Sequence, residues 1–381
     1  MRNWILPENI SDILPSEARQ IEALRRGMLD LFACYGYEQV FPPLVEYVES
    51  LFTQEDSALD LKTFKLVDEL TGRQMGLRAD ITPQVARIDA HILNRQGVTR
   101  LCYCGSVVNT RPDGLLSSRE PRQIGAEIYG STALAADVEV IELMLECLKM
   151  AGLDKTRFEI GHIGIFTALA DAAGLEGSAR DEVFVALQQK DLPALKAAAE
   201  SLPVELRAGF LSLPNCYGGE DVLALARRSL PALPAVSAAL DTLDALNVAL
   251  KLRGIVPRYD LAEMRSSYYH TGLVFAAYAG GFANAVARGG RYDSVGEKFG
   301  RSRPATGFSL DLRELSHLPY PDRRPGILAP AEDDPALLVR VRELRAAGEM
   351  VVTDLGVATG EAGCDRRLVK DGGKWQLVAL A

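Results

Sequence analysis

The amino-acid sequence predicts an α+β protein, in which an antiparallel sheet with flanking helices is interrupted by a helical insertion and followed by a small α/β unit. Three observations support this prediction. Strand-like runs and amphipathic helices share residues 1–165 and return in 254–318, residues 166–253 are rich in Ala and Leu at helical spacing, and residues 319–381 contain a strand-helix-strand pattern. We therefore expect a main domain from 1–165 and 254–318, an insertion at 166–253 and a truncated C-terminal unit at 319–381.

The first element is a long amphipathic helix after Pro15. Its apolar residues recur at helical spacing, namely Ile21, Leu24, Met28, Leu31 and Phe32. Gly36 follows where the end of a helix favours left-handed dihedral angles. The runs EQVFPPLVE, TFKLVD and MGLRAD have strand-like composition, and the polar connection ELTGRQ makes the last two a hairpin. Thr82 and Pro83 then predict the start of a helix, as its N-cap and its first-turn proline.

Two further strands and a helix complete the N-terminal part. The strands TRLCYCGSVV and PRQIGAEIYG flank the polar loop NTRPDGLLSSRE, and the helix carries Val138, Ile141, Leu145 and Leu148. The insertion is expected to be entirely helical, with breaks such as SLPNCYGGED. Strands return in RYDLAEMRSSYYHTGLVFAAYA. The C-terminal unit then gives the strand PGILAP, the helix DPALLVRVRELRAAG and the strand EMVVTDLG.

The composition limits the possible functions. Lys and Arg number 42 against 51 Asp and Glu, a net charge of −9, which argues against a basic surface for nucleic acid. No segment has the apolar length of a transmembrane helix, and the N-terminus lacks the apolar run of a secretory signal, so we expect a cytoplasmic protein without a membrane partner. The six cysteines lack the spacing of a zinc site, and Cys102 and Cys104 alternate on a strand as core thiols do. We expect neither a metal nor a cofactor.

Two pairs of glycines invite a ligand-binding interpretation. Gly289 and Gly290 in ARGGRYDSV permit a close approach of the backbone, so they could floor a ligand pocket or make a tight turn between strands. From these residues alone the turn is favoured. In FEIGHIGIFTALADAAG, Gly161 and Gly164 lack the spacing of a dinucleotide-binding fingerprint, which indicates glycines that serve packing.

Polar residues on successive strands form the candidate site. Gln123 and Glu127 lie four apart on one strand and therefore share a face, where an amide and a carboxylate could meet a ligand amine and a ring nitrogen. A solvated sheet face is the alternative. The other polar residues of this set are Arg78, Asp80, Thr82, Arg265, Tyr269, His270, Arg291 and Tyr292.

At these positions the chain resembles the catalytic region of the histidyl-tRNA synthetases, a class II synthetase fold, over about residues 1 to 318. LRADITPQVAR is similar to their Arg-Pro-Glu-Gly-Thr segment and RQIGAEIYG to their Gln-x-Gly-x-Glu strand. MRSSYYHTGLVF and GGRYD resemble their two histidine signatures, with His270 in place of a tyrosine. The resemblance implies a histidine pocket floored by the glycine pair. Its binding residues would be Asp80, Thr82, Gln123, Glu127, Arg265, Tyr269, His270 and Tyr292.

The departures from that family concern ATP and tRNA. Val108 and Asn109 stand where the second class II motif has a phosphate-binding arginine, although Arg111 lies nearby. Asp311 and Glu314 replace the glycine and the arginine of the third motif, so negative charge would oppose a bound triphosphate. The C-terminal unit is also shorter than the anticodon-binding domain of the family, which together with the acidic balance argues against tRNA.

A retained histidine pocket beside a damaged ATP site resembles the regulatory subunits of ATP phosphoribosyltransferase. That resemblance implies a non-catalytic chain that dimerises as class II folds do and pairs with a short catalytic chain at the first step of histidine biosynthesis. The catalytic chain would require it for activity, and bound histidine would favour one state of the assembly and so lower activity at a distant site. Two alternatives stay open: an active histidyl-tRNA synthetase with a divergent ATP site, and a stand-alone histidine sensor.

Overall fold

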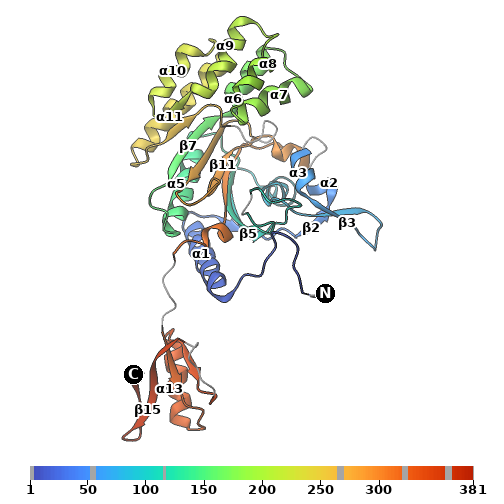
Figure 1. Cartoon of the computed structure of the whole chain (residues 1–381). Coiled ribbons are helices and arrows are strands. Elements are labelled where there is room, and N and C mark those ends of the chain that lie inside the picture. Colours follow the sequence, from blue (N-terminus) through green and yellow to red (C-terminus); the bar gives the residue numbers. More distant parts are fainter. Residues whose placement is uncertain are drawn as a thin grey trace. The chain divides into compact units, whose positions relative to one another are not determined.

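A computed structural model describes residues 4–51, 57–114, 117–263, 270–319, 325–356 and 363–380. Arg265 and Tyr269 of the candidate site lie outside these ranges. The chain divides into two compact units, Met1–Leu318 and Pro319–Ala381, and Figure 1 draws both with colours that follow the sequence. Within the described ranges, every helix is too short or too polar to cross a lipid bilayer.

The first unit is built on a nine-stranded sheet with the strand order β1-β5-β6-β12-β11-β10-β7-β9-β8. Its strands are β1 (Glu38–Gln39), β5 (Thr99–Ser106), β6 (Arg122–Tyr129), β7 (Arg157–His162), β8 (Tyr217–Gly218), β9 (Arg258–Asp260), β10 (Leu273–Tyr278), β11 (Ala287–Arg291) and β12 (Ala305–Asp311). The strands from β5 to β7 in this order pair antiparallel, as predicted. However, β1 pairs parallel with β5 and β9 pairs parallel with β7, so the sheet is mixed towards its edges.

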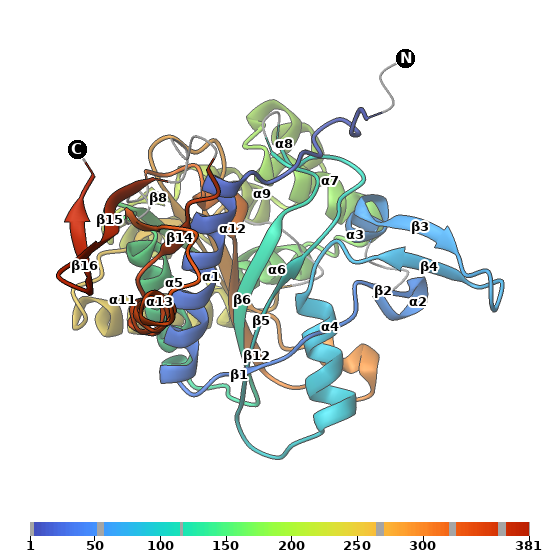
Figure 2. The ribbon, with the colours of Figure 1, turned by 90° about the horizontal axis from the view of Figure 1, so that it is seen from below.

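Two long helices, α1 (Pro15–Cys34) and α5 (Leu134–Met150), cover one face of this sheet, and Figure 2 shows both on the same side of β6 and β12. Of the predicted apolar stripe of α1, Ile21, Leu24, Met28 and Phe32 are buried and Leu31 is partly buried. The Phe32 ring meets Phe308 of β12 edge to face at 6.0 Å between centroids. Cys102 is buried in the same core. Gly36 follows α1 with a φ of 81°, which is the left-handed conformation expected after a helix. Burial of each large apolar side chain contributes about 1.5–3 kcal/mol, so the side chains packed between the sheet and these two helices stabilise the first unit.

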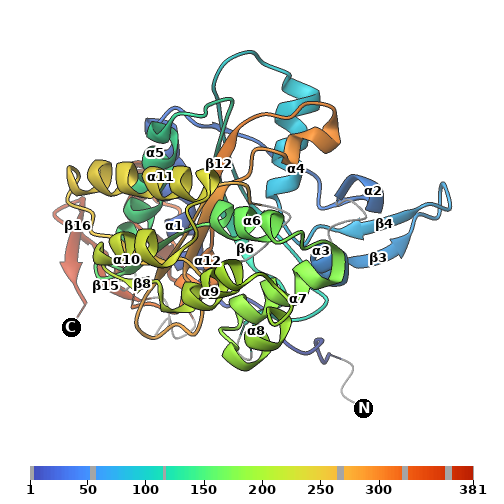
Figure 3. The ribbon, with the colours of Figure 1, turned by 90° about the horizontal axis from the view of Figure 1, so that it is seen from above.

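The insertion packs onto the same core. Its helices are α6 (Ile163–Ala172), α7 (Gly177–Gln188), α8 (Leu192–Ala198), α9 (Val204–Ser212), η2 (Leu213–Asn215), α10 (Asp221–Ser229) and α11 (Pro234–Lys251), and they lie gathered together in Figures 1 and 3. Phe166 packs against Phe184 and Phe210, at 5.3 and 6.2 Å between ring centroids. The expectation of an entirely helical insertion is wrong in one place, because β8 pairs antiparallel with β9. A two-residue strand is too short to leave an alternating pattern in the sequence.

A separate three-stranded antiparallel sheet has the order β2-β4-β3. Its strands are β2 (Val45–Tyr47), β3 (Phe64–Val67) and β4 (Gln74–Leu77). The last two form the predicted hairpin, with Phe64 opposite Leu77. The remaining helical segments of this unit are α2 (Val48–Leu51), α3 (Ser57–Lys62), α4 (Thr82–Arg87), η1 (Ile88–Leu93), η3 (Val295–Phe299) and α12 (Leu312–Leu315).

The second unit contains the predicted strand, helix and strand. They are β13 (Gly326–Ala329), α13 (Pro335–Ala346) and β14 (Val351–Thr353). A hairpin that the sequence analysis missed follows, consisting of β15 (Cys364–Asp371) and β16 (Lys374–Ala379), and the sheet order is β14-β13-β15-β16. Gly372 and Gly373 form its two-residue turn with positive φ at both positions, a conformation for which adjacent glycines are a known local signal.

Candidate functional site

A cavity of about 320 Å³ opens on the face of the central sheet that points away from α1 and α5. The register places Glu127 of β6 opposite Gly307 of β12, Gly307 opposite Gly290 of β11, and Gly290 opposite Val274 of β10. All four residues line the cavity. Neighbouring residues of a strand point to opposite faces, so Gly307 faces the cavity side while the Phe308 side chain packs against α1.

The glycine pair in ARGGRYDSV lies within β11, so the predicted turn is wrong and the pocket-floor interpretation describes its position. Steric crowding explains why glycine occupies positions 290 and 307. A Cβ added to Gly290 would lie 2.6 Å from the His270 ring, and a Cβ added to Gly307 on the next strand would lie 1.5 Å from Oε2 of Glu127. Neither distance is tolerable for a real Cβ. The glycines therefore leave the space that the Glu127 and His270 side chains occupy.

Glu127 is the centre of the site. Its side chain is buried, and its Oε1 accepts hydrogen bonds from the hydroxyls of Thr82 and Tyr103, both at 3.1 Å. Its Oε2 accepts a hydrogen bond from the Tyr292 hydroxyl. Burial raises the pKa of Glu127 to about 8, although the hydrogen bonds from Tyr292 and Tyr103 act to lower it. In this environment the Glu127 carboxyl group therefore holds its proton near neutral pH.

The turn that precedes α4 is fixed by Gln123. Its Oε1 accepts a hydrogen bond from the Ile81 backbone N–H at 3.0 Å, and its Nε2 donates to Oδ1 of Asp80 at 2.8 Å. Asp80 also accepts a hydrogen bond from the backbone N–H of Thr82 at 3.1 Å. Thr82 is therefore not the N-cap that we predicted. It is the first residue of α4, Ile81 occupies the cap position, and the Thr82 hydroxyl is directed to Glu127.

Most of the candidate residues within the described ranges come together. Those that line the cavity are Asp80, Thr82, Glu127, His270 and Tyr292. Gln123 lies on the same strand face as Glu127, as its spacing predicts, but it lines a neighbouring cavity. Desolvation lowers the pKa of His270 to about 4, so this imidazole is neutral at physiological pH.

Sequence reasoning missed Tyr103, Lys62 and Arg288. The Tyr103 ring crosses Gly125 of β6, where a Cβ would lie 2.5 Å from its hydroxyl oxygen, and so it reaches Glu127 from the adjacent strand. Alternation along TRLCYCGS places Tyr103 on the face opposite to Cys102 and Cys104, and this pattern in the sequence could have identified it. Lys62 and Arg288 line the cavity as its cationic side chains among the described residues, and nothing in their local sequence marks them.

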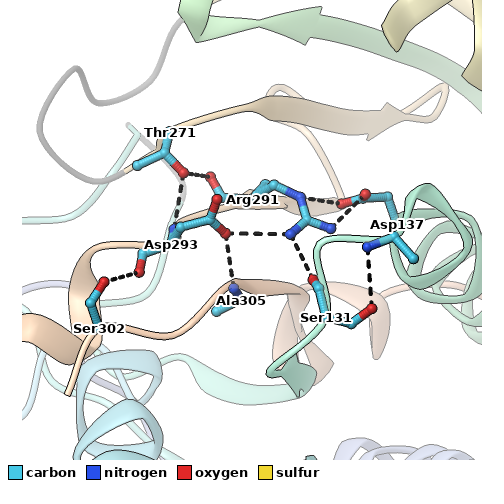
Figure 4. A network of polar contacts seen from close by, with 8 residues as sticks. Ser131, Asp137, Thr271, Arg291, Asp293, Ser302 and Ala305 are labelled. Atoms are coloured by element: carbon cyan, nitrogen blue, oxygen red, sulfur yellow. Dashed lines mark hydrogen bonds and ion pairs between the residues drawn. The ribbon is translucent and has the colours of Figure 1, made fainter. Parts of the chain in front are cut away.

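Arg291, which the sequence analysis included in the polar set, does not line the cavity but stabilises the fold through buried hydrogen bonds. Figure 4 shows its guanidinium donating to both carboxylate oxygens of Asp137 in α5, at 3.2 and 2.7 Å, and to the Ser131 carbonyl at 2.9 Å. The Thr271 backbone N–H donates to the Arg291 carbonyl at 2.8 Å, and the Thr271 hydroxyl accepts a hydrogen bond from the Asp293 N–H at 2.9 Å. These hydrogen bonds connect β11 to α5 and to the residues just before β10.

A second cavity, of about 280 Å³, adjoins the first. The two cavities share the lining residues Lys62, Asp80, Arg288 and Ser309. The other charged side chains that line the second cavity are acidic, namely Asp113, Asp311 and Glu314. Burial raises the pKa of Asp311 and of Glu314. An acidic wall of this kind repels phosphate groups as soon as its carboxyls ionise.

The Asp311 carboxylate also connects two elements of the fold, which its position in the sequence did not indicate. It accepts hydrogen bonds from the backbone N–H groups of Arg122 and Arg313, at 2.8 and 2.9 Å, and so joins the start of β6 to α12.

Two arginines that the sequence analysis considered, Arg111 and Arg78, line neither cavity. Arg111 is exposed, while Arg78 is buried with its guanidinium donating to backbone carbonyls such as that of Ser106 at 2.8 Å.

The two units of the chain match two different protein-family models, and the whole chain is similar to a solved structure. Residues 9–315 match the family model described as histidyl-tRNA synthetase, so the first unit has the class II synthetase fold that the sequence predicts. Residues 324–378 match the model described as ATP phosphoribosyltransferase subunit HisZ C-terminal domain. The solved structure of an ATP phosphoribosyltransferase regulatory subunit/histidyl-tRNA synthetase from Bacillus halodurans is similar, with a TM-score of 0.83 and 29% identity, over 95% of this chain and 96% of that one.

Two related proteins with higher sequence identity show which family the whole chain belongs to. The ATP phosphoribosyltransferase regulatory subunit of Cupriavidus necator is 54% identical over 99% of both chains, and that of Ralstonia pickettii is 55% identical over 98% of this chain and 97% of its own. The chain belongs to the family of ATP phosphoribosyltransferase regulatory subunits. Membership confirms the predicted family and its regulatory, non-catalytic role in histidine biosynthesis, and it argues against the alternative of an active synthetase.

Proposed function

We propose that the cavity on the central sheet binds free histidine, and that the chain communicates its occupancy to a short catalytic chain of ATP phosphoribosyltransferase. The chain itself performs no aminoacylation. It works in the cytoplasm as a self-associated dimer within a hetero-oligomer, and neither nucleic acid nor a membrane is a partner. Histidine lowers the activity of the assembly because it binds one of two states more tightly than the other.

The observation that carries this proposal is the environment of Glu127. The described donors to this buried carboxyl group are all hydroxyls, so a cationic ligand can approach it without breaking an internal ion pair. Histidine supplies an ammonium group and ring N–H donors, which suit such a carboxylate. A cavity of about 320 Å³ is also suited to a single amino acid, since small-molecule sites begin at about this size.

The acidic second cavity supports binding without activation. Activation of an amino acid by ATP needs cations where charge develops on the phosphates, and loss of one such donor typically costs about a hundredfold or more in rate. Here Asp311 and Glu314 stand at that wall. We expect no histidine-dependent exchange of labelled pyrophosphate into ATP by the purified chain. Exchange that disappears in a Glu127→Ala variant would instead favour an active synthetase.

Calorimetry with the purified chain tests the ligand directly. Glu127→Ala removes the buried carboxylate and should weaken histidine binding by about 2–5 kcal/mol, which is at least tenfold in affinity. Glu200→Ala is the matched control, because Glu200 is an exposed carboxylate of the insertion. An unchanged histidine affinity in Glu127→Ala would remove this residue from the site.

Reconstitution tests the regulatory half of the proposal. The chain is mixed with the short catalytic chain, the mass of the complex is measured by light scattering, and formation of phosphoribosyl-ATP is followed with and without histidine. We expect a stable complex whose inhibition by histidine is weakened by Glu127→Ala, since coupling between two such sites usually amounts to about 1–3 kcal/mol. Absence of association would favour the stand-alone sensor. If histidine inhibits the assemblies with the unmodified chain and with Glu127→Ala equally, the inhibitory site lies elsewhere.

A further inference from the structure

Arg288 lies at the junction of the two cavities and lines both of them. It is in β11, two residues before Gly290, and the register pairs it with Ser309 of β12 and with Ala276 of β10. Residues two apart in a strand share a face, so the Arg288 side chain projects from the same face as Gly290 and as Glu127 two strands away. An arginine therefore stands on the cavity floor beside glycines and other small residues.

The first cavity is lined by the acidic residues Asp80, Glu127 and Glu263 and by cationic side chains. At one end the Glu127 carboxyl group is held by hydroxyls. Among the described residues that line this cavity, the cationic side chains are Lys62 and Arg288, since His270 is neutral. Lys62 is 44% exposed and forms an ion pair at 2.5 Å with Asp113, which lines the second cavity and not the first. Arg288 belongs to β11, so its side chain projects from the sheet face that floors the cavity.

The spacing of the two ends suits a small zwitterion. Glu127 and Arg288 are on strands separated by β12, so the strand axes lie about 10 Å apart, and the two residues are offset by one side-chain repeat of about 7 Å along the strands. Between them the floor consists of Gly307, Gly290 and Ser309. The Glu127 carboxyl group lies over Gly307 and the His270 ring over Gly290, and Ser309 adds only a small side chain beside Arg288. A single amino acid with a donor-bearing side chain can span the gap between a carboxylate at one end and a guanidinium at the other.

We propose that Arg288 binds the carboxylate of the ligand whose donor groups face Glu127, and that it makes the cavity selective for amino acids that carry a free carboxylate. A guanidinium pairs with a carboxylate through two parallel hydrogen bonds, a geometry that a neutral group cannot reproduce. The inference rests on the proposed function, because it names the second contact of the same histidine site.

The test compares the binding of two ligands to the unmodified chain and to single-residue variants. Calorimetry measures the binding of histidine and of histidinol, which has a hydroxymethyl group in place of the carboxylate, to the full-length chain and to its Arg288→Met and Lys62→Met variants. The unmodified chain should prefer histidine by about tenfold or more. Arg288→Met should remove most of that preference while it changes histidinol affinity by less than about threefold. Lys62→Met should retain the preference, and Arg288→Lys should restore part of it.

Each other outcome has a defined meaning. Equal weakening of both ligands by Arg288→Met would show that the residue only shapes the pocket, and an unchanged preference would show that it does not meet the carboxylate. Selective loss in Lys62→Met or in Arg265→Met would assign the carboxylate to that residue instead. Each of these results overturns the inference while histidine binding itself stands. Failure of the unmodified chain to bind histidine would overturn the proposed function together with this inference.

Discussion

Replacing Glu127 with glutamine should stabilise the ligand-free chain, and the gain should grow with pH. Burial raises the pKa of Glu127 to about 8 from an ordinary value of 4.5. Between these two values the unfolded chain has lost a proton that the folded chain still holds, so the free energy of unfolding falls as pH rises. Glutamine resembles the protonated carboxyl group at every pH and removes this loss.

The magnitude follows from the same two values. A tenfold change in an equilibrium constant corresponds to about 1.4 kcal/mol, so the interval from 4.5 to about 8 gives about 5 kcal/mol as an upper bound. Partial relaxation around the ionised group reduces this figure, and we expect a gain of about 2–4 kcal/mol at about pH 8. Near pH 4.5 the carboxyl group is protonated in the folded chain, so the expected gain there is close to zero.

Denaturant unfolding of the ligand-free proteins, followed by circular dichroism at one chain concentration, measures the difference at each pH. Other buried carboxyl groups contribute equally to both proteins and cancel. Glu22→Gln is a control of opposite sign, because hydrogen bonds from Arg25 and Arg26 lower the pKa of Glu22 to about 2. Glu22 is 40% exposed, so its loss should cost less than about 1 kcal/mol. A difference between Glu127→Gln and the unmodified chain that does not change with pH would refute the reasoning.

Three further outcomes are expected. Histidine binding at neutral pH should release up to about one proton from Glu127, which calorimetry in buffers of different ionisation enthalpy detects; no release would mean that no cation meets this carboxyl group. Gly307→Ala should weaken histidine binding by about 2–5 kcal/mol, because its Cβ would displace the Glu127 carboxylate, whereas Gly280→Ala, with nothing within 4 Å, should leave the affinity unchanged. Arg291→Met should lower the free energy of unfolding by about 3–5 kcal/mol, because it leaves Asp137 buried without its partner; a loss below about 1 kcal/mol in a denaturation curve would contradict this.

Local patterns in the sequence predicted local features of the structure. The spacing of Gln123 and Glu127 put both on one strand face because side chains alternate with a period of two along any strand. The apolar stripe predicted α1 for the equivalent reason, with a helical period. The hairpin of β15 and β16 was missed although its signal is equally local, since Gly372 and Gly373 separate two runs that could pair. The local signal for this hairpin is therefore present in the sequence.

Features that depend on strand pairing could not be predicted from one segment at a time. The hydroxyl of Tyr292 reaches Glu127 across 165 residues of sequence, and Gly290 and Gly307 oppose one another only because β11 and β12 pair in one particular register. A pair of glycines fits a tight turn as well as a crowded strand, and the competing neighbours decide between them. The same holds for Thr82, whose hydroxyl can cap a helix or serve a distant carboxyl group with equal local plausibility.

The hydroxyl surroundings of Glu127 also suit a sensor better than a catalyst. An arginine or lysine beside this carboxyl group would have held it ionised and stabilised the fold, whereas hydroxyls leave it protonated and the first unit less stable than it could be. A cationic ligand reverses this situation, because it favours the ionised form that burial had opposed. Binding then stabilises the first unit in proportion to the logarithm of ligand concentration. A pocket whose stability depends on its occupant can bias the state of an assembly without taking part in any reaction.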